Sequence, residues 1–455
     1  MVSPAPIARA RRSTELSLVV MAGTITAGAY TLASLGEFAA IPARIIPFLA
    51  LLLGLLVLAH CAVRLFARGA DPTLLPLAAI LHGLGYVMIT RLDEELAGLQ
   101  TTWSILAIAA FVVTLVVVQR ATDLGRYRWI LLASGLGLLV LPLVPGVGVE
   151  VNGARIWVSL GPINFQPGEF AKLALAVFFA AYLAERRELL ATGTWKVGFL
   201  RLPEPRHLLP IVAAWGISVL VMVGLNDLGS SLLFFTLFVV MLWVATERLW
   251  YLLVGGVLFA GAAWASFRMF SKVQTRVDRW LDPWADPQDT GYQILQGLYG
   301  LTDGGLTGTG LGLGSPSTVP YSESDFIFTS LGEELGLFGG AAILISYLLL
   351  IGAGLRIALR TDNTFEKLLA TGLTTIVGVQ AFIIVGGVTR LVPLTGITLP
   401  FVSYGGSSLL SNYIILALLI RLSDASARRR HELPDDPTPG ERWQAWRLRR
   451  RGAPA

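Results

Sequence analysis

The chain carries many apolar runs long enough to cross a membrane, and this feature constrains its fold more than any other. A helix needs roughly 17 to 25 apolar residues to span a hydrocarbon core of about 30 Å. Because backbone groups in lipid must satisfy their own hydrogen bonds, each run predicts a helix. We therefore expect an all-α polytopic integral membrane bundle of about 12 transmembrane helices. The runs lie near 16–36, 44–63, 73–92, 102–119, 128–146, 167–185, 207–224, 230–246, 248–267, 327–355, 368–388 and 407–422.

The pair of runs from 207 to 246 leaves two alternatives open. Asn226, Asp227 and Gly229 interrupt it, so it forms either a hairpin of two spans or one long broken helix. The overall composition agrees with a membrane protein, because 54% of residues are hydrophobic and only 14% are charged. Soluble domains carry about a quarter of charged residues.

Basic residues mark one side of the membrane. If the spans alternate, most short connections that carry Arg or Lys fall on the same side as both termini, which predicts cytoplasmic termini. The segment from Arg268 to Asp325 then faces outward. The net charge of +5 is explained by these loops and the basic tail, so we do not expect nucleic acid as a partner. The single cysteine, Cys61, excludes a disulfide framework within the chain.

The first polar segment in an outer position is "VNGARIWVSLGPINFQPGEFAKLAL". It places Arg155 and Trp157 in an outer loop and Lys172 about one turn inside the next span. A lysine at that depth either faces a cavity or an anion, or snorkels toward the headgroups. Both readings fit the spacing. Trp157 alone is typical of an interfacial anchor.

The second outer segment combines paired arginines with a glycine-rich stretch. Arg276 and Arg279 are three residues apart and share one face if the stretch is helical, so they could bind phosphate. "GGLTGTGLGLG" follows, but it lacks the Lys-Ser/Thr of a Walker loop and does not follow a strand. By itself it is typical of a flexible outer loop.

Three acids stand where this segment enters the next span. Asp325 precedes an apolar helix, where an aspartate commonly caps the first turn. Glu333 and Glu334 lie inside the span, so they must be paired, protonated or facing water. At about 100° per residue, Glu333 lies some 80° from Asp325 and Glu334 on the opposite face. We therefore expect one glutamate to line the same cavity as Asp325.

The third segment, "GGVTRLVPLTGITLPFVSYGGSSLL", interrupts helix at membrane depth with Pro393, Pro400 and a pair of glycines. Broken backbone is tolerated there where it is buried in protein or lines a cavity. Arg390 would give such a cavity a cation. Transporters also use broken helices, so this pattern fits a carrier and an enzyme alike.

Together these motifs resemble the SEDS family (shape, elongation, division and sporulation), which includes RodA, FtsW and SpoVE. The words that match in family order are "NGARIW", "FQPGEFAKL", "NDLGSSLLF", "LDPWADPQDTGYQILQ", "GGLTGTGLGLGS", "SDFIFTSLGEELG" and "PLTGITLPFVSYGGSSLL". Within the family the chain is similar to the RodA branch of the actinobacterial type. The resemblance implies a core of ten spans preceded by two additional helices. It divides the chain into a cytoplasmic segment 1–15, the additional helices 16–72, the core 73–422 with the outer loop 268–326, and a cytoplasmic basic tail 423–455.

The resemblance also implies a function. The family polymerises peptidoglycan by joining lipid II units outside the cytoplasmic membrane, in elongation or division, together with a class B penicillin-binding protein. Asp325 matches its essential carboxylate, Trp157 and Lys172 match functionally important positions, and the glycine-rich loop borders its substrate cavity.

Some positions depart from the family pattern. Ile156 stands where many relatives have a basic residue, and "PYSESD" replaces "PExHTD", so Glu323 does not simply inherit the role of the family's acid. A lysine often found after the glycine-rich loop is absent, and we infer that Arg390 supplies some of the missing positive charge.

Taken with these residues, the resemblance implies an inverting glycosyltransferase. Asp325 is the expected base that activates the acceptor hydroxyl. Arg155, Lys172 and Arg276 are expected to stabilise the leaving pyrophosphate, and Glu333 to hold a cation or an arginine. No motif requires a cofactor, although a divalent cation, Mg²⁺ or Mn²⁺, could assist. The alternatives are a lipid II flippase, in which the same charges line a passage, and a scaffold that recruits other enzymes. Membrane lipids surround the protein in either case.

Overall fold

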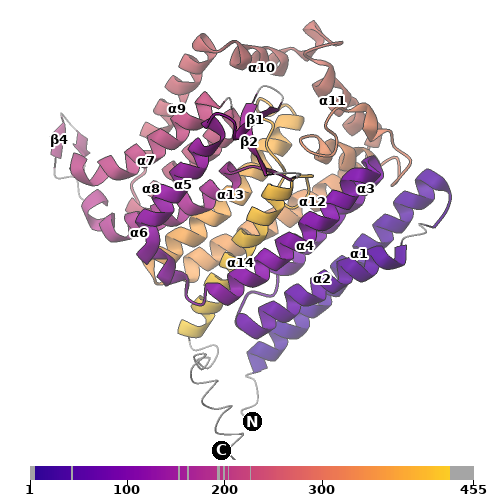
Figure 1. Cartoon of the computed structure of the whole chain (residues 1–455), viewed down its shortest axis with the longest axis horizontal. Helices are drawn as coiled ribbons and strands as arrows, with labels where there is room; N and C mark the ends of the chain where they lie inside the picture. The colour runs from indigo at the N-terminus through magenta and orange to yellow at the C-terminus, as the bar shows by residue number, and fades with distance from the viewer. Residues whose placement is uncertain are drawn as a thin grey trace, which may run out of the picture.

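The computed structural model describes residues 6–430 except 42–44, 152–153, 161–162, 192–194, 198–199, 203 and 226. These residues form a bundle of long helices with short strands and 3-10 turns (Figure 1). The helices are α1 (Pro6–Phe38), α2 (Ile45–Phe66), α3 (Leu74–Leu92), α4 (Glu94–Val117), α5 (Arg128–Val140), α6 (Gly168–Ala191), α7 (Pro205–Gly224), α8 (Leu228–Thr246), α9 (Trp250–Met269), α10 (Ser271–Leu281), α11 (Tyr292–Gly304), α12 (Ile327–Arg360), α13 (Thr364–Val388) and α14 (Gly406–Arg429). The 3-10 turns are η1 (Ala121–Tyr127), η2 (Leu141–Leu143), η3 (Pro283–Ala285) and η4 (Pro316–Thr318).

The predicted membrane fold is confirmed. Among the described residues, 11 helical segments are long and apolar enough to cross a membrane. The helix α6 has a comparable length of 24 residues and matches the predicted run 167–185, but charged residues near both of its ends lower its hydropathy. The prediction of about 12 spans corresponds to these segments and α6. The run from 207 to 246 is a hairpin, because α7 ends before Asp227 and α8 begins after it.

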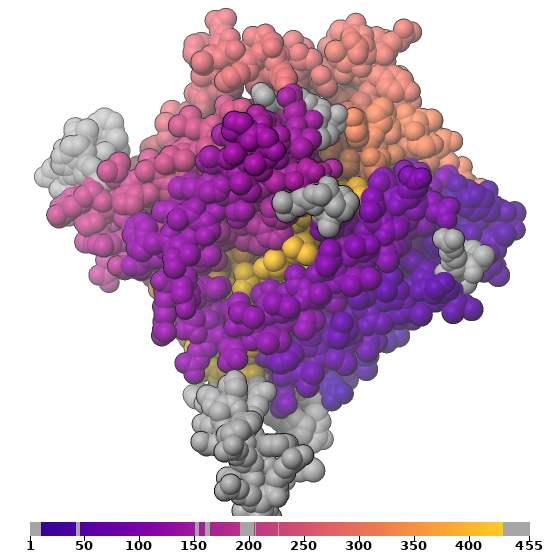
Figure 2. All heavy atoms as spheres, in the orientation of Figure 1, coloured from indigo at the N-terminus to yellow at the C-terminus, as the bar shows by residue number. Residues whose placement is uncertain are grey.

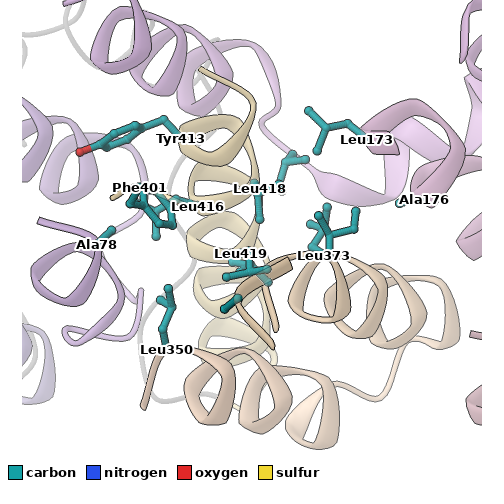
Figure 3. Close-up of a cluster of buried hydrophobic side chains, with 14 of the residues drawn as sticks. Ala78, Leu173, Ala176, Leu350, Leu373, Phe401, Tyr413, Leu416, Leu418 and Leu419 are labelled. Carbon is teal, nitrogen blue, oxygen red and sulfur yellow. The ribbon is translucent and has the colours of Figure 1, made fainter. Parts of the chain in front are cut away.

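The helix α14 runs through the centre of the bundle. In the apolar stretch of α14 that could cross a membrane, 89% of the residues are buried, whereas in that of α9 only 11% are. Other helices therefore surround α14, and α9 lies at the periphery of the bundle. Leu416 and Leu419 of α14 lie close to Leu350 of α12 and Leu373 of α13 (Figure 3). Burial of such side chains supplies the packing that fixes α14 between its neighbours.

The beginning of α1 and the end of α14 lie at the same end of the bundle. Arg11 donates a hydrogen bond to the carbonyl of Gly69, and the amide of Gly69 donates to Asp424 Oδ1 at 2.7 Å. Arg421 donates to the carbonyl of Phe66, the last residue of α2, next to the same connection between α2 and α3. Both ends of the described chain therefore meet the same inter-helix turn.

The predicted tail begins too early. The last helix does not stop at residue 422 but continues to Arg429, and Asp424 is buried. The reason is electrostatic, because Asp424 accepts hydrogen bonds from Arg428 one turn later and from the backbone of Gly69. These contacts keep a charged stretch helical and packed. Residues 431–455 of the predicted tail lie outside the described residues.

Two polar segments cover the opposite end of the bundle (Figure 1). The first is an antiparallel sheet of β1 (Gly148–Val151), β2 (Ala154–Leu160) and β3 (Ile163–Phe165), in the order β1-β2-β3, where we expected an outer loop. Its β-branched and aromatic residues favour a strand. The second joins α9 to α12 and contains α10, α11, η3 and η4. A further hairpin, β4 (Trp195–Val197) and β5 (Leu200–Leu202), lies between α6 and α7.

The contact of α3 with the segment before α14 gives a test of this packing. A Cβ at Gly85 would lie 2.2 Å from the carbonyl oxygen of Val402, whereas a Cβ at Gly98 of α4 would meet nothing within 4 Å. We expect Gly85→Ala to destabilise the protein by about 1–3 kcal/mol through overpacking. The control Gly98→Ala should leave stability unchanged or raise it slightly, because alanine favours helix. Thermal unfolding of both purified variants in detergent checks this, and equal melting temperatures would contradict it.

Candidate active site

A cavity of about 770 Å³ opens at the end of the bundle covered by the sheet and by α10. It is lined by four groups of residues. The helix α4 contributes Leu99, Thr102, Trp103 and Leu106, and the sheet with the start of α6 contributes Ala154, Ile156, Trp157, Asn164, Gln166 and Glu169. The third group, in or next to α8, α10 and α11, is Asp227, Arg276, Arg279 and Gln293. The fourth group comes from the segments before α12 and α14 and from the start of α14, and it consists of Tyr321, Glu323, Ser324, Asp325, residues 394–398 and residues 404–408. In Figure 2, part of α14 is visible in a hollow beside α4.

Asp325 lies in the cavity wall, in the turn that precedes α12. The N-cap of α12 is Phe326, which makes no side-chain capping bond, so Asp325 does not cap the helix. The turn is held by the segment before α14, where the hydroxyl of Ser403 donates to the carbonyl of Ser324 at 2.6 Å. The amide of Tyr404 donates to the carbonyl of Glu323 at 2.9 Å. The carboxylate of Asp325 is thus placed by backbone contacts around it and remains available to a ligand.

The surroundings of Asp325 favour its protonated form. Burial and, to a smaller extent, the nearby carboxylate of Glu323 raise its pKa to about 7, against the opposing effect of the Arg276 guanidinium. Burial also lowers the pKa of Arg276, which faces Asp227 as well as Asp325. A carboxyl whose pKa lies near neutrality can both accept and release a proton under physiological conditions.

The sheet brings Trp157 to the cavity but not Arg155. Trp157 and Ile156 both line the wall. The guanidinium of Arg155 instead donates to the carbonyl of Val144 at 3.4 Å, and its Nε lies close to Gly148. Arg155 therefore contacts the turn that leads into β1, and the prediction that it contacts the leaving group gains no support from its position.

Lys172 lies behind the cavity wall. Its side chain is 2% exposed, and its Nζ donates to Glu169 Oε2 at 2.5 Å and to Gln380 Oε1 at 3.0 Å. The same oxygen of Glu169 accepts a hydrogen bond from Ser411 at 2.7 Å, and Glu169 lines the cavity. Lys172 neither snorkels nor reaches the cavity wall. Its charge is balanced by Glu169, because an unpaired ammonium at this depth would be costly.

Glu333 and Glu334 bind the glycine-rich loop. Glu333 Oε1 accepts a hydrogen bond from the amide of Ser315 at 2.6 Å, and Glu334 Oε2 accepts one from the amide of Gly312 at 3.0 Å. Neither lines the cavity, so the expectation that one glutamate shares it with Asp325 is wrong. The backbone of α12 departs from helical geometry at Gly336, and the loop packs directly on this stretch. The loop is therefore fixed on α12, and none of its glycines lines the cavity.

Glu334 also connects the loop to the first helix. Arg91 at the end of α3 forms ion pairs with Glu334 (3.5 Å) and with Glu37 of α1 (3.1 Å). The backbones approach closely here, because a Cβ at Gly36 would lie 2.2 Å from the carbonyl oxygen of Leu311. The helix α1 is thus packed against the glycine-rich loop.

Arg390 likewise lies outside the cavity wall. It binds carbonyl groups at the end of α10, so the expectation that it gives the cavity a cation is wrong. The cations that do line the cavity are Arg276 and Arg279. Their spacing on α10 puts both on its inner side, as the sequence pattern predicts for a helix.

Several wall residues were not identified from the sequence. The sequence contained a signal for Asp227 as a site residue, because this acid interrupts an apolar run. In the structure its carboxylate accepts hydrogen bonds from the amide and hydroxyl of Ser230. The sequence also contained a signal for Glu169, since it is three residues from Lys172 and residues at this spacing are neighbours on a helix. Gln166 and Tyr404 reach the cavity only through tertiary packing. Among the described residues, no three His, Cys, Asp or Glu side chains come together as a metal site.

Comparisons with known proteins agree with this architecture. Residues 72–428 match the model of the cell cycle protein family of FtsW, RodA and SpoVE. The peptidoglycan glycosyltransferase RodA of Mycobacterium tuberculosis is 43% identical over 449 residues, which cover 96% of each chain. The corresponding protein of Mycobacterium leprae is 40% identical over the same length and coverage. The stage V sporulation protein E of Bacillus subtilis is 36% identical over 293 residues, which cover 63% of this chain and 76% of that protein.

Solved structures are similar as well. A chain of a peptidoglycan synthase complex that coordinates polymerization and crosslinking matches with a TM-score of 0.66 and 28% identity, covering 78% of this chain and 98% of that one. The rod shape determining protein RodA of Thermus thermophilus matches with a TM-score of 0.57 and 25% identity, covering 81% and 98%. The resemblance seen in the motifs is confirmed, and the chain belongs to the FtsW, RodA and SpoVE family of membrane proteins.

Proposed function

We propose that this protein is a peptidoglycan glycosyltransferase that joins lipid II units into glycan strands at the outer face of the cytoplasmic membrane, with Asp325 as general base. The observation that carries the proposal is the place of Asp325 in the wall of a large cavity, where burial and the neighbouring Glu323 raise its pKa to about 7. The relatives named as peptidoglycan glycosyltransferases give the reaction class.

The proposed reaction is a single displacement. The acceptor sugar hydroxyl attacks the anomeric carbon of the donor while its proton passes to the carboxylate of Asp325. The bond between that carbon and the pyrophosphate oxygen breaks, and undecaprenyl pyrophosphate leaves with the bonding electron pair. One displacement inverts the configuration at the anomeric carbon. A positioned base of this kind typically contributes 10²- to 10⁴-fold to the rate.

Arg276 and Arg279 are the proposed contacts of the departing pyrophosphate. Both line the cavity that contains Asp325. A guanidinium group can bind phosphate through two parallel N–H···O hydrogen bonds. This replaces the role predicted for Lys172, whose charge Glu169 already balances. Trp157 supplies an aromatic surface in the same wall. Assistance by Mg²⁺ or Mn²⁺ stays a prediction.

The partner and the orientation belong to the same proposal. The similar chain in a synthase complex supports a class B penicillin-binding protein, which crosslinks strands, as the partner. The basic residues at the end of the bundle where α1 begins and α14 ends support cytoplasmic termini. The flippase alternative would need a passage that opens to each side in turn. Packed leucines of α14 fill the bundle centre, which favours an enzyme with an outward cavity (Figure 3).

Removing the base should stop polymerisation. We expect Asp325→Asn and Asp325→Ala to reduce glycan strand synthesis by at least about 100-fold, because the carboxylate proposed to accept the proton is removed. The measurement is strand length on gels with purified protein, lipid II and the cognate transpeptidase. Strand synthesis at the wild-type rate by both variants would exclude Asp325 as base, and loss of lipid II translocation in liposomes would favour the flippase.

The rate should also follow the ionisation of Asp325. Only the carboxylate can act as base, so polymerisation should rise with pH through about 7 and level off above it. In Glu323→Gln the neighbouring negative charge is gone, which lowers the pKa of Asp325 and should move the rise to lower pH. Initial rates from pH 5.5 to 9 test this. A rise at the same pH in wild type and Glu323→Gln would contradict it.

A further inference from the structure

The two cations of the cavity stand on a helix that has little of its own to hold it in place. The helix α10 has 11 residues, none of them buried, and it links α9 to η3 across the outer end of the bundle (Figure 1). Arg276 and Arg279 point from it to the cavity. A short exposed helix is only marginally stable alone, so external contacts must fix its position.

Arg390 makes such contacts at the end of α10. Its Nε and Nη2 donate to the carbonyl of Trp280 at 3.2 and 2.9 Å, and Nη2 also donates to the carbonyl of Leu281 at 3.0 Å. In return, the indole Nε1 of Trp280 donates to the carbonyl of Arg390 at 3.0 Å. The guanidinium lies 4.9 Å from the ring centroid of Trp284 in η3. We call this set of contacts the Arg390 clasp.

The chemistry of the clasp suits a helix end. The last carbonyls of a helix have no partner within it, and a cation there also interacts favourably with the helix dipole. Arg390 satisfies two of these carbonyls at once, which a planar guanidinium can do and a lysine ammonium does less well. Arg390 has a φ of 60°, so its backbone is held in the left-handed region that non-glycine residues seldom adopt. The surrounding contacts must offset this strain.

The clasp connects two walls of the cavity. Arg390 begins the segment whose residues Leu394, Thr395 and Gly396 line it, and a Cβ at Gly396 would lie 3.4 Å from Asp325 Oδ2. Arg276 Nη1 reaches the same segment by donating to the carbonyl of Thr395 at 3.4 Å. Fixing α10 to this segment therefore fixes Arg276 relative to Asp325.

We infer that Arg390 is a positioning residue, which holds α10 against the 390–398 segment so that Arg276 stays beside Asp325. The inference rests on the proposed function for its catalytic consequence, whereas the anchoring of α10 can be measured without activity. It replaces the expectation that Arg390 contacts substrate.

The charges around Asp325 set the expected effect on the reaction. Glu323 precedes it in the same turn, and Arg276 faces it from α10. Arg279 of α10, Asp227 before α8 and Glu169 of α6 line the same cavity. Arg276 is the cation that stabilises the ionised form of Asp325. If α10 moves away, the pKa of Asp325 rises, and the increase in rate moves to higher pH. A shift of one pH unit would lower the rate on the rising limb about tenfold.

The anchoring is tested first by the mobility of α10. A spin label at the exposed position Asp278→Cys, in a Cys61→Ser background, reports on this helix in nanodiscs. We expect Arg390→Gln to increase the label's mobility, with Arg390→Lys intermediate. The control Arg268→Gln removes an exposed arginine at the end of α9 and should change nothing. Unchanged mobility in Arg390→Gln would overturn the inference, whatever its effect on activity.

The catalytic consequence is tested by the pH dependence of strand synthesis. Arg390→Gln should move the rise in rate to higher pH and retain most of the wild-type rate at high pH. Trp280→Phe, which removes the indole donor but keeps an aromatic ring, should act in the same direction, and the double variant should show less than the sum of the single effects. A raised KM with no displacement of the pH profile would instead mean that Arg390 contacts substrate. If Asp325→Asn is fully active, the proposed base fails while the mobility result still decides the anchoring.

Discussion

Ionisable groups inside the bundle must be paired, and this requirement explains where most of them lie. A charge taken out of water costs several kcal/mol unless a partner and hydrogen bonds replace the lost solvent. Lys172 is balanced by Glu169, and Glu334 by Arg91 and a backbone amide. Glu15 of α1 accepts bonds from His60 and Arg64 of α2. These pairs join one element to another, so the same contacts that neutralise charge also set the arrangement of the helices.

Asp325, in the cavity, is less completely paired than these groups. Asp325, Glu323, Asp227 and Glu169 line the cavity together with Arg276 and Arg279. Asp325 faces one cation and one further acid, and this imbalance, added to burial, brings its pKa close to neutrality. The anionic pyrophosphate of a bound ligand would contact Arg276 and Arg279, and a hydroxyl group would contact the carboxylate of Asp325. The division of charge within one cavity thus matches the two ends of a glycosyl transfer.

The sequence predicted the fold because apolar length, a local pattern, identifies a span. Asp325 was selected by the resemblance to a known family; it lies in the cavity wall, and its role as base stays a prediction. The roles of Glu333, Glu334 and Arg390 could not be predicted in this way. Their partners are backbone groups of Gly312, Ser315, Trp280 and Leu281, which periodicity does not reveal. Lys172 shows the same limit, because its partner Gln380 is on another helix. The spacing along the sequence predicted how deep in the membrane each charged residue lies, but it could not predict which residue pairs with it.

The close approach of α1 to the glycine-rich loop has a consequence for how such proteins diverge. The family match begins at residue 72, after α1 and α2, so these helices lie outside the shared core. Nevertheless Gly36 of α1 fits against Leu311, and Gly312 of the loop fits against Ala33, with no room for a side chain at either glycine. An N-terminal helix pair transplanted from an unrelated protein would separate these two backbones. The added helices and the loop therefore have to evolve as one unit.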